Sequence, residues 1–217
     1  MAFAGYGPVH QTFGMSFLQA LCKIDRILID ELGPWYWGTT DDKKAAEVVI
    51  TPDSLKCSRP NSGGTNPTVL TTTPLSKQNN SIRFRIPKLG NWVGVGKDES
   101  SKKILTPTIG IADSSVQITG GNTIGTQDKG VNAAYFWQSG INQLQMYGET
   151  TIKGVIEIFA GDFVDLKVDF DHNIIYVLNN ERFVGFIKPT KLTLEEGKYF
   201  FCANLSVGTE VLIDNSV

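Results

Sequence analysis

The sequence has little of the chemistry that metal sites and disulfide frameworks require. Its 217 residues include only three cysteines and two histidines: Cys22, Cys57, Cys202, His10 and His172. The cysteines are odd in number and lack C-x-x-C spacing, so neither a zinc site nor a disulfide framework is supported. Buried or neutral thiols are the simpler interpretation, and a reactive cysteine is the alternative. We therefore expect no metal, no cofactor and a cytoplasmic or nuclear location.

Long runs of one charge and long apolar runs are also absent. The 22 acidic residues nearly balance the 20 basic ones, and the formal charge is −2. No lysine or arginine run exceeds two residues, which disfavours electrostatic binding to nucleic acid or to a membrane. No stretch approaches membrane-spanning length, and the first residues do not resemble a secretory signal. A hydrophobic content of 41% is instead typical of a globular chain with a large core.

Common catalytic patterns are missing. The motifs G-x-S-x-G and H-E-x-x-H and the phosphate-binding P-loop do not occur. A glycosidase on a sandwich fold would need two carboxylates about 5–10 Å apart. The best candidates, Asp165 and Asp169, share one face of an expected strand but lie about 13 Å apart along it. We therefore expect a protein without enzymatic activity.

One strong helix signal is present near the N-terminus, in Phe17 to Leu32. Apolar residues recur there at spacings of three and four, Ser16 and Gln19 form a capping box, and Gly33 with Pro34 ends the pattern. The apolar stripe is wider than a coiled-coil seam, which favours packing on the rest of the protein over dimerisation. We expect a helical extension over residues 1–39 that packs on a single domain over 40–217, and a monomeric chain.

From residue 40 onward the chain is a succession of short β-like runs. They are separated by turn residues, and no strand–helix–strand alternation competes with them. This pattern predicts an all-β, two-sheet antiparallel β-sandwich preceded by the amphipathic helix. The expected strands are 46–51, 55–59, 68–72, 81–86, 91–96, 108–112, 116–119, 133–137, 143–147, 155–159, 163–170, 173–178, 182–187, 199–204 and 210–213.

The most informative segment is Gly161 to Ile187. Phe163 to Phe170 alternates polar and apolar residues, as in a strand with one apolar face. A polar turn follows, then the run Ile174 to Leu178, a reversal at Asn179 and Asn180, and a returning strand. We expect three antiparallel strands joined by two tight turns.

This segment resembles the signature of SPRY domains, in which an aspartate-bearing strand precedes a hairpin ending in Leu-Asn-Gly or Leu-Asn-Asn. Asn91 to Gly96 is similar to the family's W-x-x-G-V-G strand, and Ala134 to Gly140 to its tryptophan-containing middle strand. The resemblance covers about residues 40–214. It implies a concanavalin-like curved sandwich that recognises proteins, as in ubiquitin-ligase adaptors, Ran-binding proteins and scaffold proteins.

The resemblance also implies where a ligand would bind. Family members with known specificity hold a peptide between three loops, which correspond here to Ser58–Asn66, Gly120–Lys129 and Leu205–Gly208. Val207 and Gly208 replace the family's frequent aromatic–glycine pair, so a different ligand is expected. The candidate contact residues are Arg59, Asn61, Gly121, Asn122, Thr126, Gln127, Tyr135, Val207 and Gly208. Arg59 is expected outside the core because it is charged and adjoins prolines and glycines.

Three further features leave alternatives open. Asp169 to Asn173 clusters oxygen ligands, but an EF-hand glycine and distal glutamate are missing, so a self-capped turn with an exposed His172 is the preferred interpretation. The aromatic residues Trp35, Tyr36 and Trp37 either fix the helix to the sandwich or form an exposed patch. Lectins share this architecture, so carbohydrate binding is the alternative to peptide binding.

Overall fold

The computed structural model of the protein describes residues 34–60, 66–92, 103–116, 118, 133–138, 142–146, 152–153, 158–189 and 193–216. These residues form strands joined by turns and loops. The strands are β1 (Val49–Ile50), β2 (Lys56–Ser58), β3 (Thr68–Leu70), β4 (Ser81–Lys88), β5 (Gly90–Trp92), β6 (Lys103–Leu105), β7 (Thr108–Asp113), β8 (Ala133–Gln138), β9 (Asn142–Met146), β10 (Ile152–Lys153), β11 (Phe163–Asp169), β12 (Ile174–Asn179), β13 (Arg182–Ile187), β14 (Tyr199–Asn204) and β15 (Glu210–Ile213).

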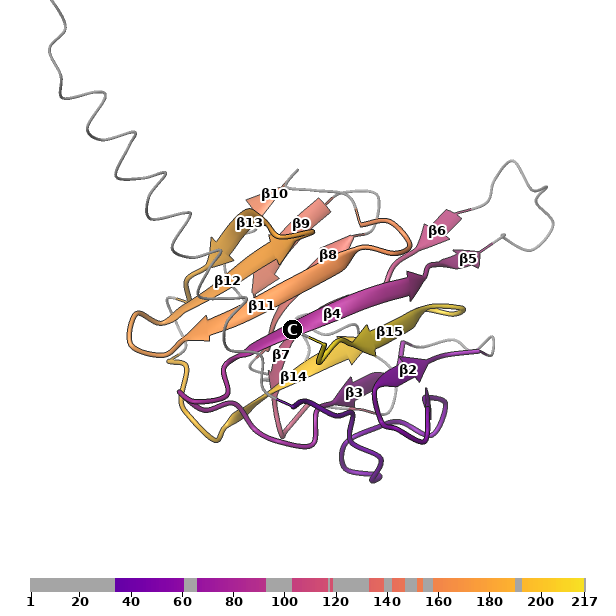
Figure 1. Ribbon diagram of the computed structural model, residues 1–217, viewed down its shortest axis with the longest axis horizontal. Coiled ribbons are helices and arrows are strands. Elements are labelled where there is room, and N and C mark those ends of the chain that lie inside the picture. Colours follow the sequence, from indigo (N-terminus) through magenta and orange to yellow (C-terminus); the bar gives the residue numbers. More distant parts are fainter. Residues whose placement is uncertain are drawn as a thin grey trace, which may run out of the picture.

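The strands form two large antiparallel sheets. One has seven strands in the order β1-β2-β15-β4-β11-β12-β13, and the other has six in the order β10-β9-β8-β7-β14-β3. The seven-stranded sheet lies in front of the six-stranded sheet in Figure 1, and β5 and β6 extend to one side as a separate two-stranded ribbon. The expected two-sheet antiparallel sandwich is confirmed.

The main core lies between the inner faces of the two sheets. Phe84 of β4 and Phe201 of β14 are fully buried in it, with their rings edge to face at 6.3 Å. Val164, Leu166 and Val168 of β11 belong to the same cluster. Because alternate residues of a strand face opposite sides, Phe163, Asp165, Lys167 and Asp169 lie on the outer face of the seven-stranded sheet.

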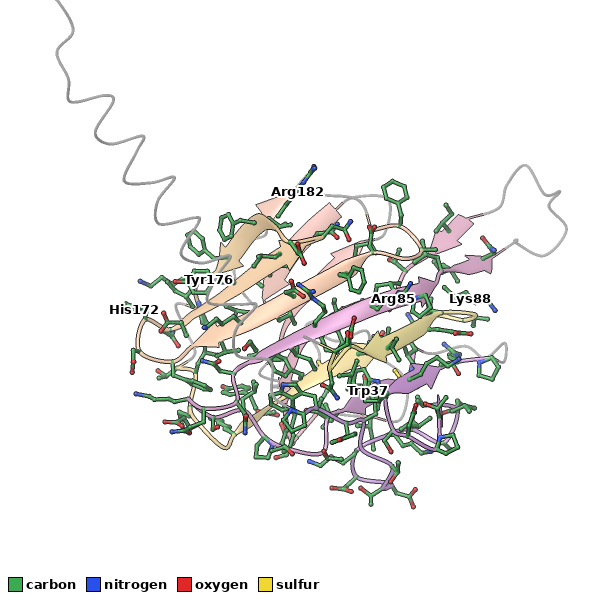
Figure 2. All side chains as sticks on the ribbon, in the orientation of Figure 1. Trp37, Arg85, Lys88, His172, Tyr176 and Arg182 are labelled. Atoms are coloured by element: carbon green, nitrogen blue, oxygen red, sulfur yellow. The ribbon has the colours of Figure 1, made fainter. Side chains whose placement is uncertain are left out.

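Trp35 and Trp37 are both buried in this core, so they do not form an exposed patch. Trp35 packs edge to face on Phe201 at 4.9 Å and donates a hydrogen bond through its indole nitrogen to the carbonyl oxygen of Ser81 at 2.7 Å. Trp37 stacks on Phe84 at 5.6 Å (Figure 2 labels Trp37). The aromatic residues therefore fix the start of the described chain to the sandwich by burial of large rings.

Several strand boundaries differ from the sequence expectations. No strand includes Val116 or Ile118, although 116–119 was expected to be one, because Val116 follows Asp113 in a turn closed by a backbone hydrogen bond. Ile158 and Phe159 also lie outside any strand. Conversely, β6 was missed, because none of the expected strands includes residues 103–105. Pairing with β5, a tertiary contact, makes Lys103–Leu105 extended.

The helix expected over Phe17 to Leu32 lies outside the described residues. The division into residues 1–39 and 40–217 stays a prediction. Within the described part of the chain, no helix has the length and apolar character needed to cross a lipid bilayer.

Candidate recognition surface

The hairpin signature is explained by a set of turn-to-turn hydrogen bonds. The Asp162 carboxylate accepts from the backbone amide of Phe159 at 2.7 Å and from the Asn180 side-chain amide at 2.9 Å. The side-chain oxygen of Asn180 accepts in turn from the amide of Phe163 at 2.9 Å. Asp162 therefore joins the turn before β11 to the turn after β12, which is a structural role.

The β12–β13 reversal lies one residue later than expected. Asn179 is the last residue of β12, and the turn residues are Asn180 and Glu181, with φ of 48° and 64°. Two successive left-handed residues produce the type I′ geometry that matches the twist of a hairpin. Glutamate is an unusual residue at such an angle.

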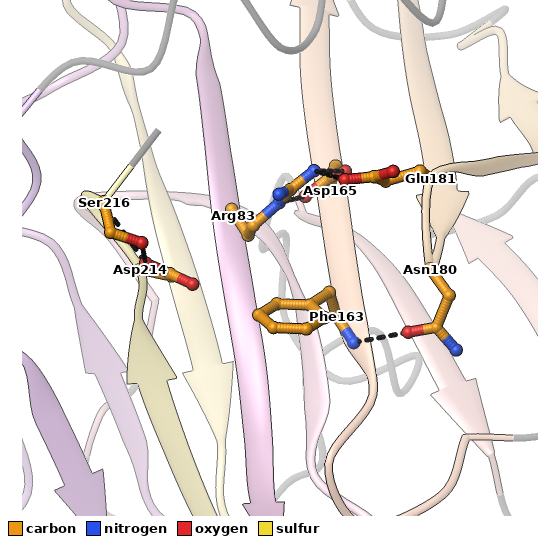
Figure 3. Close-up of polar contacts among 7 residues, drawn as sticks. All are labelled: Arg83, Phe163, Asp165, Asn180, Glu181, Asp214 and Ser216. Carbon is orange, nitrogen blue, oxygen red and sulfur yellow. Dashed lines mark hydrogen bonds and ion pairs between the residues drawn. The ribbon is translucent and has the colours of Figure 1, made fainter.

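Glu181 is held in place from the neighbouring strands. The guanidinium of Arg83 lies 3.4 Å from the Glu181 carboxylate and makes two hydrogen bonds to Asp165, at 2.7 and 2.9 Å (Figure 3). Arg83 and Asp165 are register partners on β4 and β11, and both are buried on the outer sheet face. The polar outer face expected for β11 therefore contains a buried ion pair at its centre.

The environment shifts the ionisation of this pair. Burial raises the pKa of Asp165 above its ordinary value of 3.8, although Arg83 opposes the shift. The hydrogen bond to Asp165 raises the pKa of Arg83. Asp165 makes two hydrogen bonds to the Arg83 guanidinium, which also lies near Glu181, and these contacts are those of a structural ion pair.

A second buried arginine, Arg59, lies just after β2. It is only 2% exposed, so the expectation that it lies outside the core is wrong. Its guanidinium donates to the side-chain oxygen of Asn66 at 3.1 Å and to the carbonyl oxygen of Leu205 at 3.3 Å. Burial lowers the pKa of Arg59, against a smaller opposing effect of Glu47. The arginine thus joins the ends of two expected ligand loops, 58–66 and 205–208.

Backbone hydrogen bonds complete this junction, which we define as Arg59, Asn66, Gly90, Thr106 and the segment 205–209. The amide of Gly208 donates to the carbonyl of Arg59 at 2.8 Å, and the amide of Arg59 donates to the carbonyl of Thr209 at 3.2 Å. The Ser206 hydroxyl donates to the carbonyl of Thr106 at 3.1 Å. The junction therefore ties three parts of the chain together.

Gly90 is required by close packing at the junction. A Cβ atom on Gly90 would lie 1.9 Å from the carbonyl oxygen of Val207, a distance that no real side chain tolerates. Gly208 itself has a φ of +76°, a left-handed angle that glycine adopts without cost. Val207 and Gly208 are half-buried, so part of this turn faces solvent.

The structure places only some of the expected contact residues. Arg59, Val207 and Gly208 come together at the junction. The backbone of Tyr135 lies in β8, paired with Gly110 and Gln145. The remaining candidates lie outside the described residues: Asn61, Gly121, Asn122, Thr126 and Gln127. Sequence reasoning missed Gly90 and Thr106, which belong to strands or connections distant in the chain and carry no local signal.

The Asp169–Asn173 turn is self-capped, as expected. Asp169 accepts from the amide of His172 at 3.0 Å and contacts its ring nitrogen Nδ1 at 2.8 Å, while His172 stays exposed (Figure 2). Asn173 has a φ of 56° and its side-chain oxygen accepts from the amide of Leu194 at 2.7 Å. Among the residues that the structure describes, no group of three or more histidines, cysteines or carboxylates is arranged to hold a metal ion.

Comparison with solved structures identifies the architecture. The PSpry domain of TRIM65 superposes with a TM-score of 0.65 at 9% sequence identity, over 90% of this chain and 96% of that one. A human SPRY domain gives 0.55 at 15% identity, over 79% and 96% of the two chains. The chain has a SPRY-type fold. The SPRY domain of human HERC1 agrees, with a TM-score of 0.55 at 15% identity over 78% of this chain and 94% of that one.

The SPRY-type fold is not visible in sequence comparison. No family model matches the chain, and no curated protein matches it. At 9–15% identity the solved structures share the arrangement of strands with this chain.

Proposed function

We propose that this chain is a non-enzymatic protein-interaction module that binds a short peptide segment of a partner protein through the loops 58–66, 120–129 and 205–208. The observation that carries the proposal is the Arg59 side chain, which bonds to both Asn66 and Leu205. Loops fixed to one another before binding lose less conformational entropy when a ligand arrives. Arg59 would then act by positioning the loops, while Val207 and Gly208 contact the ligand.

The same proposal extends to the setting of the protein. SPRY domains are the solved structures that this chain resembles, and they support a general role in protein recognition. We propose a monomeric substrate-recognition or scaffold component of a larger complex, such as a ubiquitin-ligase adaptor, in the cytoplasm or nucleus. Neither nucleic acid nor a membrane is part of this role, since the chain carries a net charge of only −2.

The proposal can be tested with the full-length chain on a random peptide array and on a glycan array. We expect binding to a subset of peptides, and loss of that binding in the variant Val207→Asp, which places a charge on the half-buried turn. Tyr36→Asp is the matched control, because Tyr36 is exposed and lies outside all three loops. Binding to glycans alone would make the protein a lectin, and peptide binding that survives Val207→Asp would place the site elsewhere.

A further inference from the structure

The outer face of the seven-stranded sheet carries an apolar strip over β12 and β13. We define the strip as Ile174, Tyr176, Leu178, Phe183 and Phe186. Tyr176 pairs with Lys167 on one side and with Phe186 on the other, and Leu178 pairs with Asp165 and Phe183. Since register partners share a face and Asp165 faces outward, these side chains lie on the outer face. Figure 2 labels Tyr176 on this side of the sheet.

The strip is partly withdrawn from water. Leu178 is 1% exposed, although it lies outside the main core cluster, and Lys167 beside it is also buried. Phe186, at the sheet edge, is 44% exposed. Neighbours on the same face, here Asp165 and Phe183, cover part of Leu178, and a segment lying over the sheet would cover the rest. No described strand does so, since the described strands lie beside or behind β11 to β13 in Figure 1.

The described chain begins beside β4, in the same sheet as this strip. Trp35 donates its backbone amide to the Asn215 side chain at 3.1 Å and its indole N–H to the carbonyl of Ser81 at 2.7 Å. Ser81 is the first residue of the cross-strand row Ser81, Lys167, Tyr176, Phe186. Three strand spacings give this row a width of about 14 Å. Residues immediately before Trp35 therefore start at the Ser81 end of this row, two strands away from β12.

We propose that the segment Phe17–Leu32 docks as an amphipathic helix on this strip, covering Leu178 and the exposed part of Phe186. The sequence of this segment predicts an apolar stripe, which could pack on the apolar side chains of the strip. A helix of this length would be about 24 Å long, enough to span the row. Only Gly33 and Pro34 separate the segment from Trp35, which is fixed to the sandwich. The effective concentration of the segment near its own strip is therefore high, which favours docking within one chain over docking on a second copy. The helix would seal an outer sheet face and leave the junction loops free.

Native Cys22 lies in the proposed helix, which allows a crosslinking test on the full-length chain. Cys57 and Cys202 are buried, and burial raises the pKa of both thiols, so they react poorly in the folded protein. In the variant Lys188→Cys, which adds an exposed thiol just beyond β13, a short bis-maleimide is expected to join Cys22 to position 188 within one chain. In the matched variant Ile104→Cys, whose site is 64% exposed on the remote β5–β6 ribbon, we expect no such product.

A denaturing gel separates crosslinks within one chain from crosslinks between two chains, and mass spectrometry of peptides identifies the two cysteines that are joined. An intramolecular Cys22 crosslink that forms with Lys188→Cys, fails with Ile104→Cys and is lost on adding Leu28→Asp supports the proposal. An equal yield in both cysteine variants, no crosslink, or a crosslink only between two chains would overturn it. As a second measurement, Phe186→Asp is expected to lower the melting temperature, and Leu28→Asp to add little further, because both remove the same contact. Additive shifts would also overturn the proposal.

Discussion

Arg83 and Arg59 are both buried arginines, yet the surroundings of each give it a different role. Arg83 lies within a long strand and makes a two-bond ion pair with its register partner Asp165. Arg59 lies at the end of a short strand and donates to neutral oxygens of Asn66 and Leu205. The pKa of Arg83 is raised by its carboxylate partner, whereas burial lowers the pKa of Arg59.

The difference shows that a buried arginine can either join two strands of a sheet or join two loops. At Arg83 the ion pair offsets part of the cost of removing two charges from water, and the pair joins β4 to β11. At Arg59 a delocalised guanidinium, which is more weakly hydrated than an ammonium, donates to the oxygens of Asn66 and Leu205 and so joins the ends of two loops. The first arrangement stabilises the scaffold, and the second positions the surface proposed to bind a partner.

The largest expected effect is at the ion pair. Arg83→Met should destabilise the fold by about 3–5 kcal/mol, because it leaves Asp165 buried without its partner. The double variant Arg83→Met with Asp165→Leu should cost much less than the sum of the two single variants. Urea unfolding measures both. The control Arg85→Met removes an exposed guanidinium that also lies 5.5 Å from the Phe163 ring, and we expect a change within about 0.5 kcal/mol. Strict additivity would show that the pair is not coupled.

The next largest effect is expected at Gly90. Gly90→Ala forces its Cβ against the carbonyl of Val207, so the 205–209 turn must move at a cost of about 1–3 kcal/mol. Thermal unfolding should show this loss, together with chemical-shift changes at Thr209 and Thr106. Gly197→Ala is the control, since its Cβ would meet nothing within 4 Å and only the left-handed angle is penalised. Unchanged shifts at the junction in Gly90→Ala would mean that the turn is not packed on this glycine.

A smaller stability effect is expected at Arg59, with a larger effect on ligand binding. Arg59→Met removes the hydrogen bonds to Asn66 and Leu205 and should cost about 1–3 kcal/mol, less than Arg83→Met. Arg59→Lys keeps the charge but loses the planar guanidinium. We therefore expect it to restore the free energy of unfolding more fully than it restores peptide binding. Unfolding free energies and peptide-array binding provide the two measurements. If Arg59→Lys restored binding completely, the charge alone would be responsible.

The smallest effects concern pH and distinguish the buried pair from a surface pair. Lys77 lies 2.5 Å from Asp171 and lowers the pKa of that carboxylate, whereas burial raises the pKa of Asp165. Stability from the Lys77 pair is present above the ordinary value of 3.8 and is lost as pH falls through the lowered pKa. For Asp165 the folded state holds the proton more tightly, so the free energy of unfolding falls as pH rises from 3.8 through the raised pKa.

Carbon-13 NMR of the carboxyl groups can follow these two aspartates individually. We expect the Asp165 midpoint above 3.8 and the Asp171 midpoint below it. Arg83→Met should raise the Asp165 midpoint further, while Lys77→Met should return Asp171 to its ordinary value. Equal midpoints for Asp165 and Asp171 would contradict the contrast between buried and exposed pairs.

Local sequence patterns were enough to predict the strand-rich character of the chain, the three-strand segment from Gly161 to Ile187, and the self-capped turn at Asp169. Alternation of side chains and turn-forming residues are local signals, and a strand's faces follow from its own residues. The SPRY-type fold could be expected from the resemblance carried by the same segment, in which Asp162 and Asn180 hydrogen-bond the two turns.

Which polar residues are buried and which loops meet depends on contacts that form when the chain folds. The sequence predicts a loop position outside the core for Arg59. In the structure the side chain is buried and donates to Asn66 and to Leu205, which is far along the chain. The role of Gly90 depends on a carbonyl at Val207, and β6 depends on its pairing with β5. These features arise from contacts between residues distant in the chain. A local pattern of side chains does not predict such contacts.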